Sequence, residues 1–153
     1  RDRSPSRGLG DVYKRQPLEY GKAEVLYEES EILLLAVGSM VKTALTVRER
    51  LKEKGYSCSL VNARFVKPFD EELLLKLQKN HKLLVTLEEN VQSGGFGEHV
   101  LEFMNTSGDG SMEVLNIAIP DVYVEHGNVE LLRKETGIDA DGIIGKIIDR
   151  KAQ

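Results

Sequence analysis

The chain has 153 residues, of which 41% are hydrophobic and 30% charged, and its formal net charge is -4. This size and apolar content suit one globular domain with a single core. The mild charge and the absence of a long run of Lys or Arg argue against a nucleic-acid partner. The longest apolar stretch, residues 32–37, is too short to cross a bilayer, and the first residues lack a signal-peptide pattern, so we expect a cytoplasmic protein without membrane contact.

The first sixteen residues differ in composition from the rest of the chain. They carry five basic and two acidic side chains, show no hydrophobic period and look like translated adapter sequence. The first methionine, Met40, lies deep inside an apolar pattern. We therefore predict a disordered tail over residues 1–16 and a folded domain over residues 17–153 that is a fragment of a longer protein.

Beyond the tail, strand-like apolar runs alternate with helical patterns, which is typical of parallel strands joined by crossover helices. Strands are predicted at residues 23–28, 31–37, 56–63, 82–87 and 113–119. Helices are predicted after Ser39, from Asp70, after Gly97, over residues 128–135 and after Asp139. The pattern therefore predicts an α/β domain with a mostly parallel sheet.

The ends and faces of these helices can also be predicted. Ser39 and Asp139 are expected to cap their helices through their side chains, and Ile138 has the spacing of a hydrophobic staple with Ile143. The helix after Ser39 should bury its apolar stripe and leave Arg48 in solvent, together with Lys42, Glu49 and Lys52. Cys58, the single cysteine, is expected to be a small core residue and not a nucleophile.

Two glycine-rich motifs invite a functional interpretation. Gly108-Asp109-Gly110 matches the metal-binding triplet of thiamine-diphosphate enzymes, but it follows a predicted helix within a polar stretch, so we interpret it as a turn. Gly94-Gly95-Phe96-Gly97 joins a strand to a helix, where free N–H groups can bind an anion such as phosphate. A tight turn that lets Phe96 pack is the preferred interpretation.

The acidic and imidazole side chains do not form a legible catalytic set. Glu88 and Glu89 are adjacent in a strand and should point to opposite faces, which excludes a paired acid and base and favours interface or structural ion pairs. His81, His99 and His126 lack the spacing of metal ligands. His126, in a loop, is expected to contact solvent or a second subunit.

Three stretches together resemble one family. Residues 61–70, residues 84–90 with 94–97, and residues 119–121 with 124–127 resemble the last of the three domains of the 1-deoxy-D-xylulose-5-phosphate synthase family, a transketolase-type C-terminal domain. The similarity runs from about Tyr20 to the C-terminus. The β-subunits of 2-oxoacid dehydrogenases share the Glu-Glu pair and the glycine-rich turn but differ around residues 64–68.

The resemblance implies a three-layer α/β/α fold with a mixed, mostly parallel five-stranded sheet whose first strand is antiparallel. It implies a homodimeric parent enzyme that uses thiamine diphosphate and magnesium to decarboxylate pyruvate and join the two-carbon unit to D-glyceraldehyde 3-phosphate, for isoprenoid, thiamine and pyridoxal synthesis. In that family the cofactor and its activating glutamate lie in the two preceding domains. No catalytic, cofactor-binding or metal residue is therefore assigned in this chain, which is predicted to be inactive alone.

What remains for this domain is packing against the preceding domains and support of the dimer. The candidates for those contacts follow or end strands: Arg64, Lys67, Glu88, Glu89 and His126. Alternative functions are a freestanding interaction or regulatory module, and the C-terminal part of another transketolase-like enzyme, a split subunit or a 2-oxoacid dehydrogenase β-subunit. The sequence of the flanking DNA would separate these alternatives.

Overall fold

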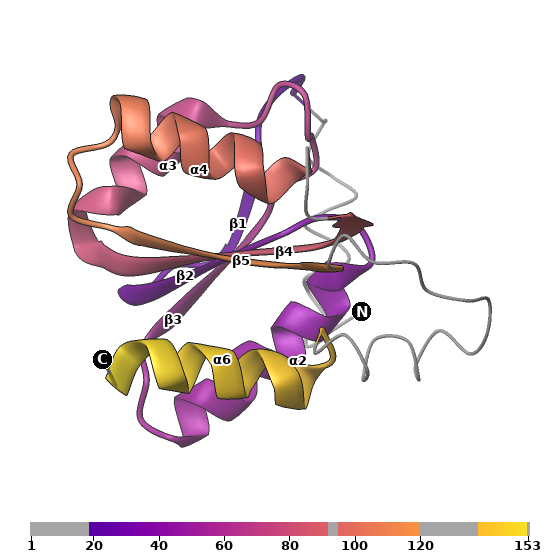
Figure 1. The fold of residues 1–153 in the computed structure, drawn as a ribbon, viewed down its shortest axis with the longest axis vertical. Coiled ribbons are helices and arrows are strands. Elements are labelled where there is room, and N and C mark those ends of the chain that lie inside the picture. The colour runs from indigo at the N-terminus through magenta and orange to yellow at the C-terminus, as the bar shows by residue number, and fades with distance from the viewer. Residues whose placement is uncertain (1–18, 92–94, 120–137, 153) are drawn as a thin grey trace.

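The computed structural model describes residues 19–91, 95–119 and 138–152. It shows a five-stranded sheet between two helical layers (Figure 1). One face is covered by α3 (Glu71–Leu77) and α4 (Phe96–Ser107), and the other by α2 (Met40–Glu53) and α6 (Ala140–Ala152). The predicted three-layer α/β/α fold is confirmed. The predicted tail, the helix over residues 128–135 and His126 lie outside the described residues.

The sheet is mixed, as predicted. Its order is β1-β3-β2-β4-β5, with β1 antiparallel to β3 and all other pairs parallel. The strands are β1 (Glu24–Tyr27), β2 (Glu31–Ala36), β3 (Cys58–Asn62), β4 (His81–Val91) and β5 (Glu113–Ile119). Strand β4 extends beyond its predicted end at Leu87, because Val91 pairs with Ile119 after a shift of register.

Each face of the sheet has its own core, which explains the uninterrupted apolar run in β2. Ile32 and Leu34 pack with α2 and α6, whereas Leu33 and Leu35 pack with α3 and α4. Successive strand residues point to opposite faces, so a strand covered on both sides needs apolar residues at every position.

Side chains at the helix starts behave in two ways. Asp70 Oδ1 accepts a hydrogen bond from the Leu73 N–H at 3.3 Å, and Asp139 Oδ1 accepts one from Gly142 N–H at 3.0 Å, so both acidic caps form. Ser39 occupies the cap position of α2 without a side-chain capping bond, and its hydroxyl donates to Glu89 instead. The predicted Ser39 cap is wrong because the backbone of Ser39 is already helical, with φ -63° and ψ -18°, whereas a capping side chain needs an extended backbone to reach the first N–H groups.

Arg48 is the clearest error of the helix prediction. It was expected in solvent but its side chain is 4% exposed. Its Nε donates to the Cys58 carbonyl at 3.0 Å, its guanidinium pairs with Glu29, and its Cζ lies 3.9 Å from the centroid of the Tyr27 ring. A long side chain on the border of the apolar stripe reached an acceptor that helical periodicity cannot show.

Within the described ranges, no helix combines the length and apolar character needed to span a membrane.

Candidate functional site

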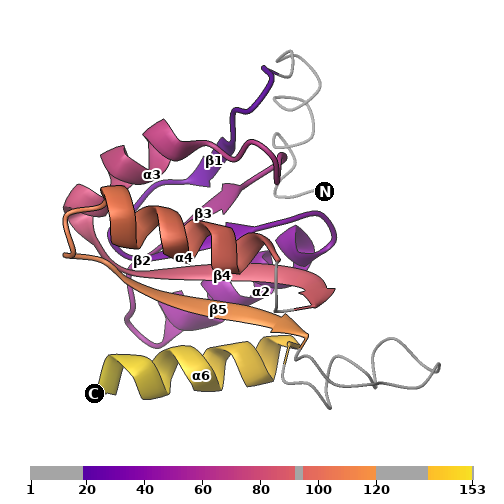
Figure 2. The same ribbon diagram turned by 45° about the horizontal axis from the view of Figure 1, so that its top comes forward.

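The parallel strands β4 and β5 end on the same side of the domain (Figure 2). Arg64 and Lys67 follow β3, and Glu88 and Glu89 lie in the last part of β4. This is the edge at which open α/β sheets place ligands and partners. The structure therefore brings four of the five candidates to one edge, although their side chains have very different surroundings.

Glu88 and Glu89 point to opposite faces of the sheet, as predicted. Glu88 is 1% exposed, and its carboxylate accepts hydrogen bonds from Phe96 N–H at 2.9 Å and from Gly97 N–H on the α4 side. Glu89 accepts the Ser39 hydroxyl on the α2 side. The two carboxylates therefore hold one helix start each and do not form a catalytic pair.

The start of helix α4 already faces an acidic group, which is the carboxylate of Glu88. Gly95 is extended, with φ -83° and ψ -179°, and α4 begins at Phe96, so the first N–H groups of the helix point toward that carboxylate. A negative charge is favourable at this positive end of the helix dipole. These donors are occupied within the chain, and Phe96, which is 1% exposed, packs into the core as predicted.

Helix α4 approaches the sheet closely at Gly97. A Cβ atom built on this residue would lie 2.8 Å from the side chains of both Asn116 and Thr86. The Thr86 hydroxyl donates to Asn116 Oδ1 at 2.7 Å, which satisfies this polar pair beneath the helix. Gly97 therefore has a packing role: it lets the N–H groups of the helix start reach Glu88.

Arg64 is largely enclosed by its own domain. Its Nη2 lies 3.2 Å from Glu24 Oε1, and the two side chains are 9% and 10% exposed. Its backbone has φ 61°, a left-handed conformation, and its N–H donates to Asn62 Oδ1 at 3.1 Å. This contact ties the loop after β3 to the edge strand β1.

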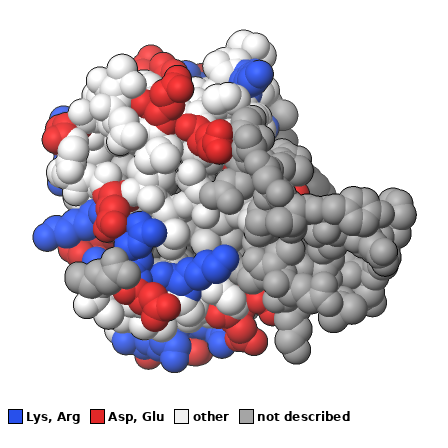
Figure 3. All heavy atoms as spheres, viewed as in Figure 1, with Lys and Arg blue, Asp and Glu red and all other residues white. Residues whose placement is uncertain are grey.

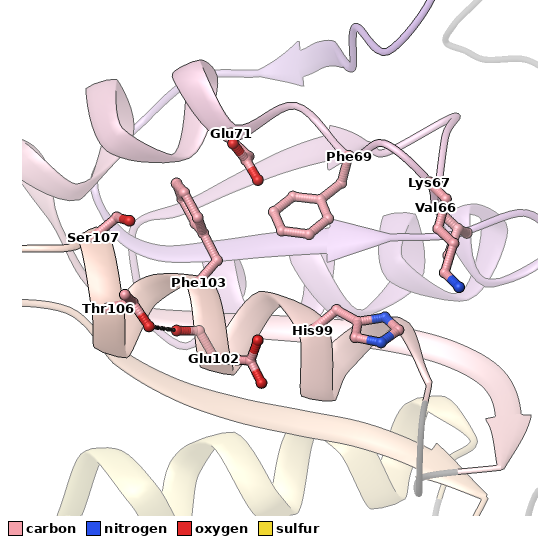
Figure 4. A pocket seen from close by; sticks show the side chains of 9 residues that line it. All are labelled: Val66, Lys67, Phe69, Glu71, His99, Glu102, Phe103, Thr106 and Ser107. Atoms are coloured by element: carbon pink, nitrogen blue, oxygen red, sulfur yellow. Dashed lines mark hydrogen bonds between the residues drawn. The ribbon is translucent and has the colours of Figure 1, made fainter.

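Lys67, in contrast, is exposed and lines an open groove between α3 and α4 (Figure 4). The groove has a volume of about 380 Å³. Phe69 and Phe103 contact each other in it edge to face, with ring centroids 5.6 Å apart. Its other lining residues are Val66, Glu71, His99, Glu102, Thr106 and Ser107.

The histidines in the described chain serve structure or line the groove. His81 is 2% exposed, with Nδ1 2.7 Å from the Leu77 carbonyl and Nε2 2.8 Å from Ser59 Oγ. Because a carbonyl only accepts, Nδ1 carries a proton, and the Ser59 hydroxyl can donate to Nε2. Sequence reasoning missed this buried network, since Ser59 and His81 are distant in the sequence and no local pattern connects them.

The described residues do not fit thiamine diphosphate or its magnesium ion. Asp109 Oδ1 accepts from Ser111 N–H at 2.9 Å and from the Ser111 hydroxyl, and these bonds hold the pKa of Asp109 below its usual value. Gly110, with φ 81°, completes the turn, which confirms the turn interpretation. In the described ranges no three His, Cys, Asp or Glu side chains are grouped to hold a metal, and Glu88 already occupies the helix N–H groups.

Comparison with known proteins decides the family. The model of the transketolase C-terminal domain matches residues 21–143. The chain belongs to the transketolase C-terminal domain family. Among curated relatives of this domain, the 1-deoxy-D-xylulose-5-phosphate synthase of Lachnoclostridium phytofermentans is 49% identical over 139 residues, which is 91% of this chain and 22% of that protein.

Other relatives also match this chain over a small part of their own length. The enzyme of the same name from Dehalococcoides mccartyi is 44% identical over 151 residues, 95% of this chain and 23% of that protein. The Pelotomaculum thermopropionicum enzyme is 41% identical over 145 residues. The chain thus spans about 22% of the length of the first of these relatives.

Solved structures support the same fold. A split-gene transketolase, solved as an inactive β4 tetramer, superposes with a TM-score of 0.78 at 26% identity, over 88% of this chain and 42% of that one. The transketolase of Campylobacter jejuni superposes with a TM-score of 0.60 at 18% identity, over 88% of this chain and 19% of that one. The second likeness shows the fold alone.

Proposed function

We propose that this chain is the C-terminal domain of a 1-deoxy-D-xylulose-5-phosphate synthase. The observation that carries the proposal is the 49% identity over 139 residues with the Lachnoclostridium phytofermentans enzyme. In this proposal the parent is a cytoplasmic transferase that joins a two-carbon unit from pyruvate to D-glyceraldehyde 3-phosphate with loss of carbon dioxide. Thiamine diphosphate and magnesium bind to its preceding domains and not to this chain.

The role that we propose for the domain is structural: it packs against other parts of the parent enzyme and supports its dimer. Residues 17–153 form the domain and residues 1–16 are a tail without function. The contact candidates Arg64, Lys67, Glu88, Glu89 and His126 lie, in this proposal, against a preceding domain or the second subunit of a homodimer. Glu88 acts there as a positioning residue, since its carboxylate is engaged with Phe96 and Gly97 and shapes the turn that would make the contact.

A domain exchange tests the proposal. Residues 17–153 replace the matching domain of the Lachnoclostridium phytofermentans synthase, and formation of the five-carbon product is measured with all substrates and cofactors. We expect activity within about tenfold of the parent, because the two domains share their fold and core. The same enzyme truncated before the domain is the negative control, and an exchange with the domain of the Clostridium perfringens enzyme, 40% identical to this chain, is the positive one.

Two results bear on the proposal. An exchanged enzyme no more active than the truncated one, while the Clostridium perfringens exchange works, would overturn the assignment. The 153-residue chain alone, supplied with pyruvate, D-glyceraldehyde 3-phosphate, thiamine diphosphate and magnesium, should release no carbon dioxide. Tight stoichiometric binding of thiamine diphosphate by this chain would contradict the division of roles between the domains.

A further inference from the structure

The groove between α3 and α4 has the chemistry of a receptor for a cation. It is lined by the edge-to-face pair of Phe69 and Phe103, whose ring centroids are 5.6 Å apart. Glu71 comes from α3 and Glu102 from α4, and both line the same space (Figure 4). Aromatic faces attract guanidinium and ammonium groups, and a nearby carboxylate adds a charge-assisted hydrogen bond.

The two carboxylates are available for a ligand. Neither Glu71 nor Glu102 forms a side-chain hydrogen bond or ion pair with any other described residue, and both are exposed. The Thr106 hydroxyl donates to the backbone carbonyl of Glu102 at 2.7 Å and leaves its carboxylate alone. The neighbouring Glu72, in contrast, lies 3.8 Å from Lys22.

The surroundings of the groove strengthen its negative character. Glu72 on α3 and Glu98 on α4 are also exposed, although Glu72 lies beside Lys22 and Glu98 has an interaction partner of its own. Figure 3 shows acidic side chains with few basic ones over the α3–α4 layer of the visible face, whereas the opposite helical layer carries basic and acidic side chains together. The exposed cation that lines the groove, Lys67, lies at the end where His99 also points into it. The field at the middle of the groove therefore favours a positive group.

The openness of the groove distinguishes a protein segment from a small metabolite. Five of its lining side chains are exposed: Lys67, Glu71, Glu102, Thr106 and Ser107. Pockets for small molecules usually enclose most of the ligand, which a groove bordered by exposed side chains does not do. An extended segment, in contrast, can place one side chain in the groove and lie across its borders.

We propose that the α3–α4 groove binds an arginine side chain on an extended segment of a partner protein. The guanidinium stacks on the ring of Phe69 or Phe103 and hydrogen-bonds to Glu71 or Glu102, because a planar fork of donors suits both contacts. An acidic residue close to that arginine faces Lys67. This inference does not depend on the activity of the parent enzyme.

The test is a titration of the isotope-labelled 153-residue chain with the blocked tripeptide Ac-Glu-Gly-Arg-NH2, followed by amide chemical shifts. We expect saturable shifts confined to residues of the groove, with a dissociation constant on the order of 1 mM, as befits one anchoring side chain. The same peptide with citrulline in place of arginine keeps the shape and removes the charge, and it should bind at least tenfold more weakly.

Variants and a small cation complete the test. Glu71→Gln with Glu102→Gln should weaken peptide binding at least tenfold, Phe103→Leu should weaken it severalfold, and Glu53→Gln on α2 should leave it unchanged. Agmatine, an arginine analogue without a peptide backbone, should bind at least threefold more weakly than the peptide. The proposal is overturned by an absence of saturable shifts, by equal binding of the citrulline peptide or the glutamine variant, or by agmatine binding as tightly as the peptide.

Discussion

Glu88 Oε1 accepts a hydrogen bond from Phe96 N–H at 2.9 Å, so a strand carboxylate closes the start of helix α4 from within the domain. A second oxygen of the same group accepts Gly97 N–H. The bond joins the end of β4 to the next helix across the glycine-rich turn. In this stretch the sequence allowed an anion such as phosphate, although a tight turn that lets Phe96 pack was the preferred interpretation.

Glu88→Gln tests this bond. A glutamine presents one oxygen and one NH2 group to two N–H donors, so one buried donor loses its acceptor. We expect the free energy of unfolding to fall by about 1–3 kcal/mol in urea denaturation. Glu53→Gln, an exposed change on α2, should alter it by less than about 0.5 kcal/mol. Equal stability of the two variants would contradict the role given to Glu88.

Two glycines in helices should respond in opposite directions to alanine. At Gly97 a Cβ would lie 2.8 Å from Asn116 and Thr86, so Gly97→Ala should lower the free energy of unfolding by about 1–3 kcal/mol. At Gly145, in α6, a Cβ would meet nothing within 4 Å, and Gly145→Ala should raise it by about 0.5–1 kcal/mol. Thermal unfolding of both variants provides the comparison, and a shift of the same sign would argue against close packing at Gly97.

Arg48→Met should destabilise the domain far more than Arg50→Met on the same helix. Arg48 is 4% exposed and bonds to the Cys58 carbonyl, whereas Arg50 is 42% exposed and pairs with Asp141, itself 76% exposed. We expect a loss of roughly 1–3 kcal/mol at position 48 and less than about 1 kcal/mol at position 50. Chemical denaturation at pH 7 measures both.

Arg48→Met should also change how the stability of the domain depends on pH in the acidic range. Burial raises the pKa of Glu29, but the charge and hydrogen bond of Arg48, with a smaller effect of Lys52, outweigh it and lower the pKa below its ordinary value of 4.5. A depressed folded-state pKa gives stability that is present above pH 4.5 and is lost as the pH falls through the lowered pKa. Stability should therefore decline less steeply below pH 4.5 in Arg48→Met than in the unmodified chain, and parallel curves would count against the pair.

Cys58 should be unreactive in the folded chain. Burial raises the pKa of its thiol to about 12, so almost no thiolate exists at pH 8. Ellman's reagent should modify the thiol at a rate set by unfolding and should react at once in 6 M guanidinium chloride. Rapid modification under native conditions would show that β3 is not covered by α2 as described.

Arg64→Ala separates a local role from an interface role. The loss of its contact with Glu24 should destabilise the isolated domain by about 1–3 kcal/mol, since both side chains are nearly buried. In the full-length parent the same change should also weaken dimerisation or turnover. Unchanged sedimentation and kinetics of the full-length enzyme would remove Arg64 from the proposed contacts and leave its role within the domain.

The fold could be predicted from local patterns because hydrophobic periodicity and residue composition indicated the same secondary structure at the same positions. The continuous apolar run of β2 predicted a strand covered on both faces. Strand β5 was predicted with its observed bounds, Glu113–Ile119. The opposite orientations of Glu88 and Glu89 followed from strand geometry alone. The antiparallel direction of β1 came from the family resemblance, since no pattern in four residues encodes a direction.

The errors arose where a side chain has a partner distant in sequence. Serine is a residue type that often caps helices, but the hydroxyl of Ser39 donates a hydrogen bond to Glu89, fifty positions away. Helical periodicity places Arg48 on the solvent side of α2, but its side chain bonds to Glu29 and to the Cys58 carbonyl. Such contacts depend on which strands become neighbours, and helical periodicity carries no information about that.

The strand order also has a consequence for the folding of the domain during its synthesis on the ribosome. Among the described strands β1 is synthesised first and pairs with β3, and the central strand β2 needs both β3 and the later β4 as neighbours. Strand β2 can pair with β3 early, but its other edge stays open until His81–Val91 has left the exit tunnel. Until β4 is synthesised, the central strand of the sheet should thus present an unpaired apolar edge that favours aggregation.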